Sequence, residues 1–450
     1  MNKENIKLII DKGLNENKIK QISKIKKEPK WMLDYRLNAY KAFMNLNIPN
    51  WKKLEKLDLN LDDIYYYIKP DGNITDSWNK VPTKIKDTFD KLGIKDAEEK
   101  YLSGIATQYE SEMVYHNIKK ELDDLGVIFL DTDTALKKYP NLFKEYFGKL
   151  VPYSDNKFSA LNSSVWSGGS FIYIPKGVKL EKPLQSYFRM NSKKLGQFER
   201  TLIIVDEGAS LHYIEGCTAP TYSSNSLHAS VVEIYVKKNA YCRYTAIQNW
   251  SNNVYNLVTK RAITEENAIM EWIDGNLGSK YNMKYPSIIL KGDNSKGTTI
   301  SIAVANNTVQ DAGAKMIHLG KNTSSKIISK AISKNGGINN YRGYVVHNKN
   351  AINAKTDVEC DTLLLDNLSK SNTIPYSKIE NNTTTFKHEA KVSKIDEQNL
   401  FYMMSKGIPE SVAKDMLILG FIDPFTKELP MEYAIELNEL LKLSMEGSVG

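Results

Sequence analysis

The stretch VKKNAYCRYTAI, residues 236–247, runs from an apolar residue through a polar turn and a small residue into an alternating strand pattern. The same order returns in ITEENAIMEWIDG, residues 263–275, and in five further segments that begin at residues 205, 290, 319, 347 and 379. The small residues recur at steps of 31, 28, 29, 26, 28 and 32; they are Ala209, Ala240, Ala268, Gly297, Thr323, Ala351 and Thr383. A unit of about 29 residues built from strands predicts a solenoid with parallel stacked strands, a parallel β-helix.

Each small residue is expected where the chain turns tightly into the next strand, and the alternation is expected to send every second side chain into the stack. A β-sandwich whose hairpins fall at similar intervals is the alternative. On both sides of the repeats the spacing of apolar residues becomes helical. We therefore predict a mainly β protein with three parts: a mostly helical domain over 1–150, a parallel β-helix over 151–395 and a helical domain over 396–450.

Two flanking segments carry more specific predictions. LDDLGVIFLD, residues 122–131, predicts a helix end followed by a short strand. In the C-terminal part, helices are expected to stop at Gly407, at Gly420 and at the FIDPF turn, with Pro409 and Pro430 at helix starts. Such a helical tail would cap the unpaired last coil of the solenoid.

The composition is that of a globular chain of 450 residues, 41% of them hydrophobic, with a net charge of +8. The charge is spread along the chain, whereas nucleic-acid-binding proteins cluster it, so no nucleic-acid partner is expected. No segment reaches the 18 or more apolar residues of a membrane span, and no signal segment is expected. The three cysteines, Cys217, Cys242 and Cys360, form no CxxC pair and predict reduced thiols in a reducing compartment.

Cys360 and His388 are 28 residues apart, which is one repeat step. In a stack of coils they are expected on adjacent strands, about 4.8 Å apart, at nearly the same place along the turn. A thiolate, an imidazole and the carboxylate of Glu389 could then converge on one metal ion. However, one face of a strand displays only one of His388 and Glu389 unless a bulge re-aims the other. The alternative is a small buried cysteine and a solvated histidine.

Cys217 lies in HYIEGCTAP, residues 212–220, where glycine and proline flank the thiol. This context predicts a thiol that leaves its strand for an exposed position suited to accepting sulfur, whereas Cys242 is expected to be a packed strand residue. Four further histidines show no ligand spacing and are interpreted as ordinary strand or turn residues: His212, His228, His318 and His347.

The segment GDNSKGTT, residues 292–299, nearly matches a phosphate-binding loop but has Thr298 where the lysine belongs. The lysine supplies the charge on the phosphates, and the expected strand-to-helix context is missing as well. We therefore expect no ATP hydrolysis by this chain alone.

Several motifs together resemble the SufB scaffolds of the SufB/SufD family, which build iron-sulfur clusters in the Suf pathway. They include SVWSGGSFIYIPKGV (164–178), YFRMN (187–191), GQFERTLIIVDEGASLHYIEGCTAP (196–220), IQNW (247–250), VTKRA (258–262), CDTLLLDN (360–367) and HEAKVSK (388–394). The resemblance runs through nearly the whole chain and is most specific from about residue 160 onward. It implies a right-handed parallel β-helix between helical ends.

Carried over by motif, the resemblance gives roles to nine residues. Cys217 looks like the acceptor of persulfide sulfur, and Cys360, His388 and Glu389 look like the site of the nascent cluster. A path that relays sulfur between them would consist of Arg189, Asn191, Gln248, Trp250 and Lys260. The family often has an acidic residue before the His-Glu pair, and this chain has Lys387 there, which leaves the role of a further carboxylate open.

The resemblance also implies partners and a cargo. It predicts an assembly scaffold without enzymatic activity, in complex with the ATPase SufC and with SufD or a second SufB copy, where SufC docks on the C-terminal helical tail. Sulfur would come from a persulfide donor such as SufE with a cysteine desulfurase, and the transient iron-sulfur cluster would pass to apo-proteins; reduced flavin in the complex is a further expectation. The composition fits a bacterial cytoplasm or a plastid-type organelle such as the apicoplast.

Two other classes of function remain open from the residues. Parallel β-helices also serve as polysaccharide lyases and hydrolases, but the clustered acidic or Ca²⁺-binding residues of those enzymes are not visible here. A pure protein-interaction solenoid would leave Cys217 and Cys360 replaceable, so serine substitution of each thiol separates the two possibilities.

Overall fold

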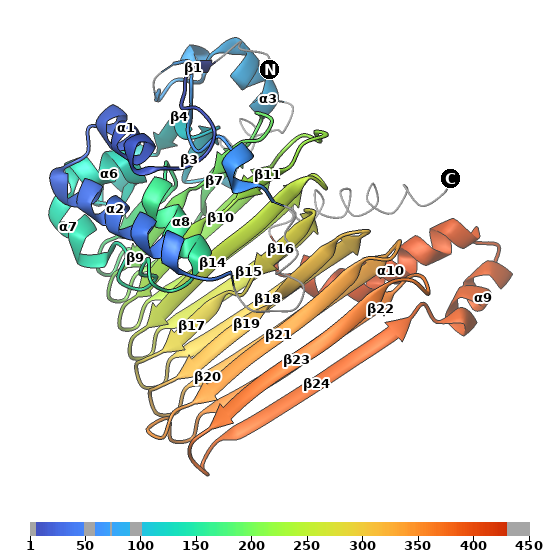
Figure 1. The fold of residues 1–450 in the computed structure, drawn as a ribbon. Helices are drawn as coiled ribbons and strands as arrows, with labels where there is room; N and C mark the ends of the chain where they lie inside the picture. Colours follow the sequence, from blue (N-terminus) through green and yellow to red (C-terminus); the bar gives the residue numbers. More distant parts are fainter. Residues whose placement is uncertain (1–5, 49–58, 73, 91–100, 430–450) are drawn as a thin grey trace.

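The structure is a computed structural model of the chain that describes residues 6–48, 59–72, 74–90 and 101–429. Two long sheets dominate it (Figure 1). The first sheet holds, in spatial order, β24 (Thr385–Lys394), β22 (Lys355–Leu364), β20 (Ser324–Lys334), β18 (Lys296–Asn306), β15 (Ile269–Gly278), β13 (Tyr241–Trp250), β10 (Ser210–Thr218), β7 (Leu184–Arg189), β3 (Gly104–Tyr109) and β4 (Glu112–Ile118). The second holds β23 (Lys370–Ile379), β21 (Ile338–His347), β19 (Val309–His318), β16 (Tyr281–Lys284), β14 (Val254–Thr264), β12 (Val231–Val236), β9 (Arg200–Val205), β6 (Ser170–Ile174) and β5 (Ile128–Asp131), with β8 (Gly196–Gln197), β11 (Ser226–His228) and β17 (Ser287–Leu290) beside them.

The chain alternates between the two sheets, and each strand from β13 to β24 pairs in parallel with its counterpart one coil earlier. This stacking confirms the predicted β-solenoid and excludes a sandwich of hairpins, in which neighbouring strands would be antiparallel. The main core lies between the sheets, where alternate side chains such as Tyr244, Met270 and Trp272 are buried.

The tight turn of each coil has a left-handed residue directly before the small residue. These left-handed residues are Gly208, Asn239, Asn267, Asn294, Asn322 and Asn353, with φ between 55 and 67°. Asparagine suits this conformation because its short polar side chain can bond locally. The small residues that follow are Ala209, Ala240, Ala268, Ser295, Thr323 and Ala354, so the alignment by Gly297 and Ala351 is wrong in phase by two and three residues.

The N-terminal part combines helices with strands that already belong to the solenoid. Its helices are α1 (Glu16–Lys26), α2 (Lys30–Asn45), α3 (Thr83–Asp90), α5 (Lys120–Asp124), α6 (Thr132–Lys138), α7 (Pro140–Tyr146) and α8 (Lys157–Val165), with η2 (Leu61–Asp63), η3 (Trp78–Lys80), β1 (Ile6–Ile9) and β2 (Ile68–Pro70). The segment 122–131 forms the end of α5 followed by β5, as its sequence predicts. Because β3, β4 and β5 join the two long sheets, the mostly helical description does not hold for residues 104–131.

The C-terminal part forms α9 (Glu397–Ser405) and α10 (Glu410–Thr426), with Pro409 at the N-cap of α10 as predicted. The predicted stops at Gly420 and at FIDPF are wrong, because α10 continues through both. Ile418, Ile422 and Phe425 bury against the outer face of the first sheet, and this packing outweighs the helix-breaking preference of glycine. The predicted start at Pro430 lies outside the described residues.

The solenoid is not capped by the tail among the described residues. α10 contacts β18 and β20 along the side of the stack, whereas β23 and β24 form an end with mostly exposed side chains (Figure 1). The predicted capping role is therefore wrong for α9 and α10. No helix in the described part of the chain is long and apolar enough to cross a membrane.

Candidate functional site

Cys360 and His388 meet on the last two strands of the first sheet. Cys360 Sγ lies 3.3 Å from His388 Nε2, which confirms that the two residues occupy adjacent coils. They are not at the same position along the turn, because His388 is paired with Val358 and the step between these coils is 30 residues. The offset of two residues keeps both side chains on the inner face, so they still converge.

Glu389 does not join this pair. The pairing of β22 with β24 runs without a bulge from Lys355↔Thr385 to Leu364↔Lys394, so successive side chains of β24 point to opposite faces. The Glu389 side chain is exposed on the outer face, and only its backbone oxygen contacts Cys360 Sγ, at 3.5 Å. The predicted convergence of all three side chains on one metal is therefore wrong in this chain.

The environment of the Cys360–His388 pair favours the neutral forms. Burial raises the pKa of Cys360 to about 11, although a hydrogen bond with Thr373 acts against it. Burial also lowers the pKa of His388, so its imidazole is neutral at pH 7 and offers a lone pair. A thiol and a neutral imidazole at this distance can bind a soft or borderline metal ion, which would displace the thiol proton.

Cys217 is buried, which contradicts its predicted exposed position. It lies within β10, and its side chain has no exposed surface. The adjacent Gly216 is not a turn residue: a Cβ there would come within 2.6 Å of the Tyr187 ring, so the close ring explains the glycine. Burial, followed by the nearby carboxylates of Glu215 and Glu199, raises the pKa of Cys217 well above its usual range.

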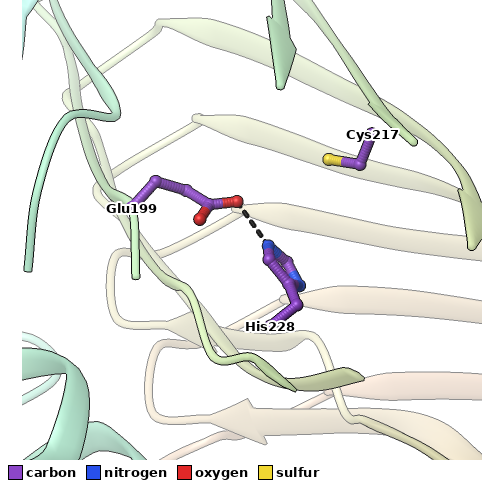
Figure 2. Close-up of side chains that lie close together, drawn as sticks. All are labelled: Glu199, Cys217 and His228. Carbon is purple, nitrogen blue, oxygen red and sulfur yellow. Dashed lines mark hydrogen bonds and ion pairs between the residues drawn. The ribbon is translucent and has the colours of Figure 1, made fainter. Parts of the chain in front are cut away.

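Two buried residues that the sequence analysis missed lie beside Cys217. Atoms of Glu199, Cys217 and His228 that can bind a metal all lie within 4.8 Å of one another, the only such group of three among the described residues (Figure 2). His228 Nε2 contacts Glu199 Oε1. Glu199 and His228 are 29 residues apart, one repeat step, so the period that linked Cys360 to His388 could have found them.

The other cysteine and histidine predictions agree with the structure. Cys242 is a fully buried strand residue of the main core. His212, His318 and His347 bond hydroxyl groups of neighbouring strands or turns, at 3.0 Å to Thr245 in the case of His212. The segment 292–299 leads through a turn into β18 and not into a helix.

The five predicted relay residues divide into two groups. Gln248, Trp250 and Lys260 lie near Cys217: Gln248 is its register partner in β13, the Trp250 ring is 4.6 Å from that of His228, and the charge of Lys260 acts to lower the pKa of Cys217. Arg189 and Asn191 lie at the end of β7, where Arg189 donates to the Thr218 hydroxyl at 2.8 Å and the Asn191 amide donates to Glu110 Oε2 at 3.1 Å.

A buried column of polar side chains runs through the second sheet from His228 towards Cys360. The register places these residues in one row, in order: His228, Asn256, Asn282, Gln310, Asn339 and Ser371. Asn256 Nδ2 donates to Asn282 Oδ1 at 2.7 Å, and Asn282 Nδ2 donates to Gln310 Oε1 at 2.9 Å. Ser371 Oγ donates to Thr362, which is two residues beyond Cys360 on β22. Sequence spacing of 26 to 32 residues signals this row too.

The two cysteines lie five coil steps apart, from β10 through β13, β15, β18 and β20 to β22. At about 4.8 Å per step the separation is about 24 Å. A sulfur atom cannot pass directly between thiols over this distance.

The chain matches two family models and many known proteins. Residues 188–421 match the model described as "SUF system FeS cluster assembly, SufBD core domain", and residues 14–186 match "SufBD protein N-terminal region". It is 60% identical over 441 residues to the "Iron-sulfur cluster assembly protein SufB" of Bacillus subtilis, covering 98% of this chain and 95% of that protein. SufBD family proteins of Staphylococcus haemolyticus and Staphylococcus epidermidis show the same identity and coverage.

Proposed function

The chain belongs to the SufBD family of the SUF system for iron-sulfur cluster assembly, and on this premise we propose that it accepts persulfide sulfur at Cys217 and holds the nascent cluster at Cys360 and His388. Its role in iron-sulfur cluster assembly follows from the family. The assignment of the cluster position rests on one observation, the 3.3 Å contact between Cys360 Sγ and His388 Nε2 on the outermost coils.

Two ligands do not complete the coordination of a cluster. Cluster irons are held by four protein ligands in most proteins, and histidine can replace cysteine. Glu389 faces away from the pair, so the remaining ligands would come from a partner surface that covers β23 and β24. The isolated chain is then expected to hold its cluster weakly.

The sulfur step at Cys217 is a thiol–persulfide exchange. The Cys217 thiolate attacks the terminal sulfur of the donor persulfide, the S–S bond of the donor breaks, and the donor leaves as a thiolate. Cys217 then carries the persulfide. Conversion of its outer sulfur to sulfide consumes two electrons, which reduced flavin in the complex would supply, as the family resemblance suggests.

The buried polar column supports transfer through the interior. It links the surroundings of Cys217 to Thr362 beside Cys360 by amide and hydroxyl groups, whereas the rest of the main core is apolar. An anionic sulfur species would find hydrogen-bond donors along this row, which lowers the cost of its passage through a buried region. Gln248 and Lys260 would form the entrance to the path.

The exposed surfaces support two partner positions. The terminal strands β23 and β24 carry exposed apolar side chains, among them Ile374, Tyr376 and Val392, next to an unpaired sheet edge. Such an edge pairs readily with another chain, so SufD or a second copy of this chain would dock there. α9 and α10 expose Phe401, Tyr402 and Met416, where the ATPase SufC would bind. The predicted contribution of residues 430–450 to that docking lies outside the described residues.

Location remains a prediction. The relatives named above are bacterial, which agrees with the expected bacterial cytoplasm, and the plastid-type alternative rests on composition alone.

The proposal is tested by anaerobic reconstitution of the full chain with ferrous iron and sulfide. Cys360→Ser and His388→Ala should each lower the cluster absorbance and alter the Mössbauer spectrum, because each removes a ligand. Cys242→Ser is the matched control and should leave both unchanged. If Cys360→Ser reconstitutes like the unsubstituted chain, the cluster is held elsewhere and the chain acts as an interaction scaffold only.

Sulfur acceptance has its own measurement. After exposure to a persulfide donor, mass spectrometry should find the added sulfur on Cys217 before Cys242. The donor must reach a buried thiol, so the reaction is expected to accelerate when the partner subunits are present. Sulfur added first to Cys242 would contradict the assignment.

A further inference from the structure

Glu199, Cys217 and His228 bring three different metal-binding groups together in the interior of the solenoid. Glu199 lies between β8 and β9, Cys217 near the end of β10 and His228 at the end of β11. None of the three residues is more than 1% exposed. Figure 2 shows the thiol pointing towards the paired carboxylate and imidazole. This cluster is separate from the Cys360–His388 pair, from which it lies five coils away.

The hydrogen bonds fix which nitrogen of His228 carries a proton. Asn256 Nδ2 donates to Gln248 Oε1 at 2.8 Å and to Asn282 Oδ1 at 2.7 Å, so Asn256 Oδ1 is left to accept a hydrogen bond. That oxygen lies 2.5 Å from His228 Nδ1, which therefore donates. In neutral His228 the lone pair is then on Nε2, the nitrogen that faces Glu199.

A cation must lie between His228 Nε2 and the Glu199 carboxylate. A lone pair and a carboxylate oxygen repel each other, so their contact requires either a proton, which makes an imidazolium ion, or a metal ion. The second oxygen, Glu199 Oε2, is buried and has no hydrogen-bond partner. A buried carboxylate oxygen without a partner is unfavourable, and a bound metal ion would satisfy it together with the thiol.

We infer that Glu199, Cys217 and His228 form a binding site for one divalent transition-metal ion of the class from ferrous iron to zinc. A thiolate, an imidazole and a carboxylate suit these borderline ions. Ligand atoms around a tetrahedral ion of this class are about 3.5 Å apart, so atoms within 4.8 Å need to move by only about 1 Å. Asn256 orients the imidazole, as hydrogen-bond partners of metal-binding histidines commonly do.

The site would leave one coordination position open, as catalytic sites with three protein ligands do. Metal binding deprotonates a thiol outright, so the ion would convert the buried Cys217 to a thiolate despite the neighbouring carboxylates. The open position would then accept an exogenous sulfur ligand. The metal site stands on the geometry of the three side chains and does not rest on the proposed sulfur acceptance.

Anaerobic titration of the full-length Cys360→Ser variant with cobalt(II) tests the site, because this background removes the other cysteine–histidine pair. We expect one equivalent of bound cobalt and a thiolate-to-cobalt charge-transfer band. Adding Cys217→Ser should abolish the band, and His228→Gln or Glu199→Gln should weaken binding at least about tenfold. Cys242→Ser in the same background is the matched control and should keep the band.

X-ray absorption on the Cys360→Ser protein provides a second measurement that does not depend on the folding of site variants. It should show one sulfur at about 2.3 Å and nitrogen or oxygen at about 2.0–2.2 Å in a zinc-loaded sample. Absence of sulfur from the coordination shell, or a band that survives Cys217→Ser in a folded chain, would overturn the inference. Persulfide labelling of Cys217 with a chelator present separates the two proposals, because labelling without metal binding sinks only this one.

Discussion

The two cysteine sites lie on the same sheet five coils apart, yet they differ in how complete they are. Around Cys217 the interior supplies its own partners: Glu199 pairs with His228, and Asp274 pairs with two lysines. Around Cys360 the next coil is β24, which is the last strand of its sheet and mostly exposed. Because the coils repeat the same backbone, the difference arises from what covers each site. The inner site is built by this chain alone, and the edge site is open to completion by a partner.

The largest difference is expected in stability, through the buried ion group below Cys217. Asp274 Oδ1 bonds Lys260 at 3.1 Å and Lys284 at 3.0 Å, and all three side chains are no more than 1% exposed. Asp274→Ala would leave two buried ammonium groups without a carboxylate and should reduce the free energy of unfolding by about 3–5 kcal/mol. Urea denaturation followed by circular dichroism measures this. Glu266→Ala, which removes the exposed partner of Lys238, is the control and should cause no measurable change.

The same group gives a pH dependence with a definite sign. Burial favours neutral Asp274, but Lys260 and Lys284 outweigh burial and lower its pKa below 3.8. A group whose pKa is lowered by folding stabilises the protein above its unfolded pKa, and this contribution is lost as the pH falls. Asp274→Ala should therefore lose less stability relative to the unsubstituted chain near pH 3 than at pH 7. An equal loss at both values would show that Asp274 is not ionised in the folded chain.

Thiol reactivity should separate the sites next. Cys360 is 5% exposed beside the open end, whereas Cys217 and Cys242 are fully buried. In the native chain iodoacetamide should label Cys360 at least about tenfold faster than either other cysteine. With its pKa raised to about 11, the thiolate fraction of Cys360 and its labelling rate should rise about tenfold per pH unit between pH 7 and 10. Peptide mass spectrometry at several times measures all three; faster labelling of Cys217 would reverse the comparison.

The sequence predicted the solenoid and the edge pair because both depend on the repeat. Cys360 and His388 were found by a step of 28, and they meet although the actual step is 30, because a shift of two residues preserves the face of a strand. The same reasoning explains why Glu389 was misplaced: the next residue always takes the other face. The repeat was followed through small residues, but the left-handed asparagines mark the turns more regularly.

The inner site could not be predicted in the same way, because local context was misleading there. Gly216 suggested a turn and an exposed thiol, yet it makes room for the Tyr187 ring. His228 showed no local ligand spacing, since its partner Glu199 lies one coil earlier and Cys217 comes from the opposite sheet. Contacts across the interior depend on how the two sheets face each other, and the repeat length does not determine that.

The edge site should respond differently to its two polar neighbours. His388→Ala should lower the affinity of the chain for zinc or cobalt at the Cys360 site at least about tenfold, because it removes a ligand. Glu389→Gln should change it less than about twofold, because that side chain faces outwards. Metal titration in a Cys217→Ser background isolates the site. An equal loss from both substitutions would place the Glu389 carboxylate in the coordination shell.

The smallest effect is expected where the two regions use the same device, at the left-handed asparagines of the turns. Asn267, near the inner site, donates to Asn239 of the previous coil at 2.9 Å, and Asn353, near the edge, donates to Asn322 at 3.3 Å. Asn267→Ala and Asn353→Ala should each lower the free energy of unfolding by about 1 kcal/mol, because alanine is disfavoured at positive φ.

Glycine at the same positions relieves the backbone strain but loses the exposed side-chain hydrogen bond, so Asn267→Gly and Asn353→Gly should change stability by only about 0.5 kcal/mol. Urea denaturation of the four variants makes the measurement. Because the turn is closed by its own residues and not by its neighbours, each substitution should have nearly the same effect at both positions. A much larger loss at Asn353 would mean that the last coils depend on local turn geometry more than the covered ones do, which would extend the contrast between the sites from their side chains to their backbone.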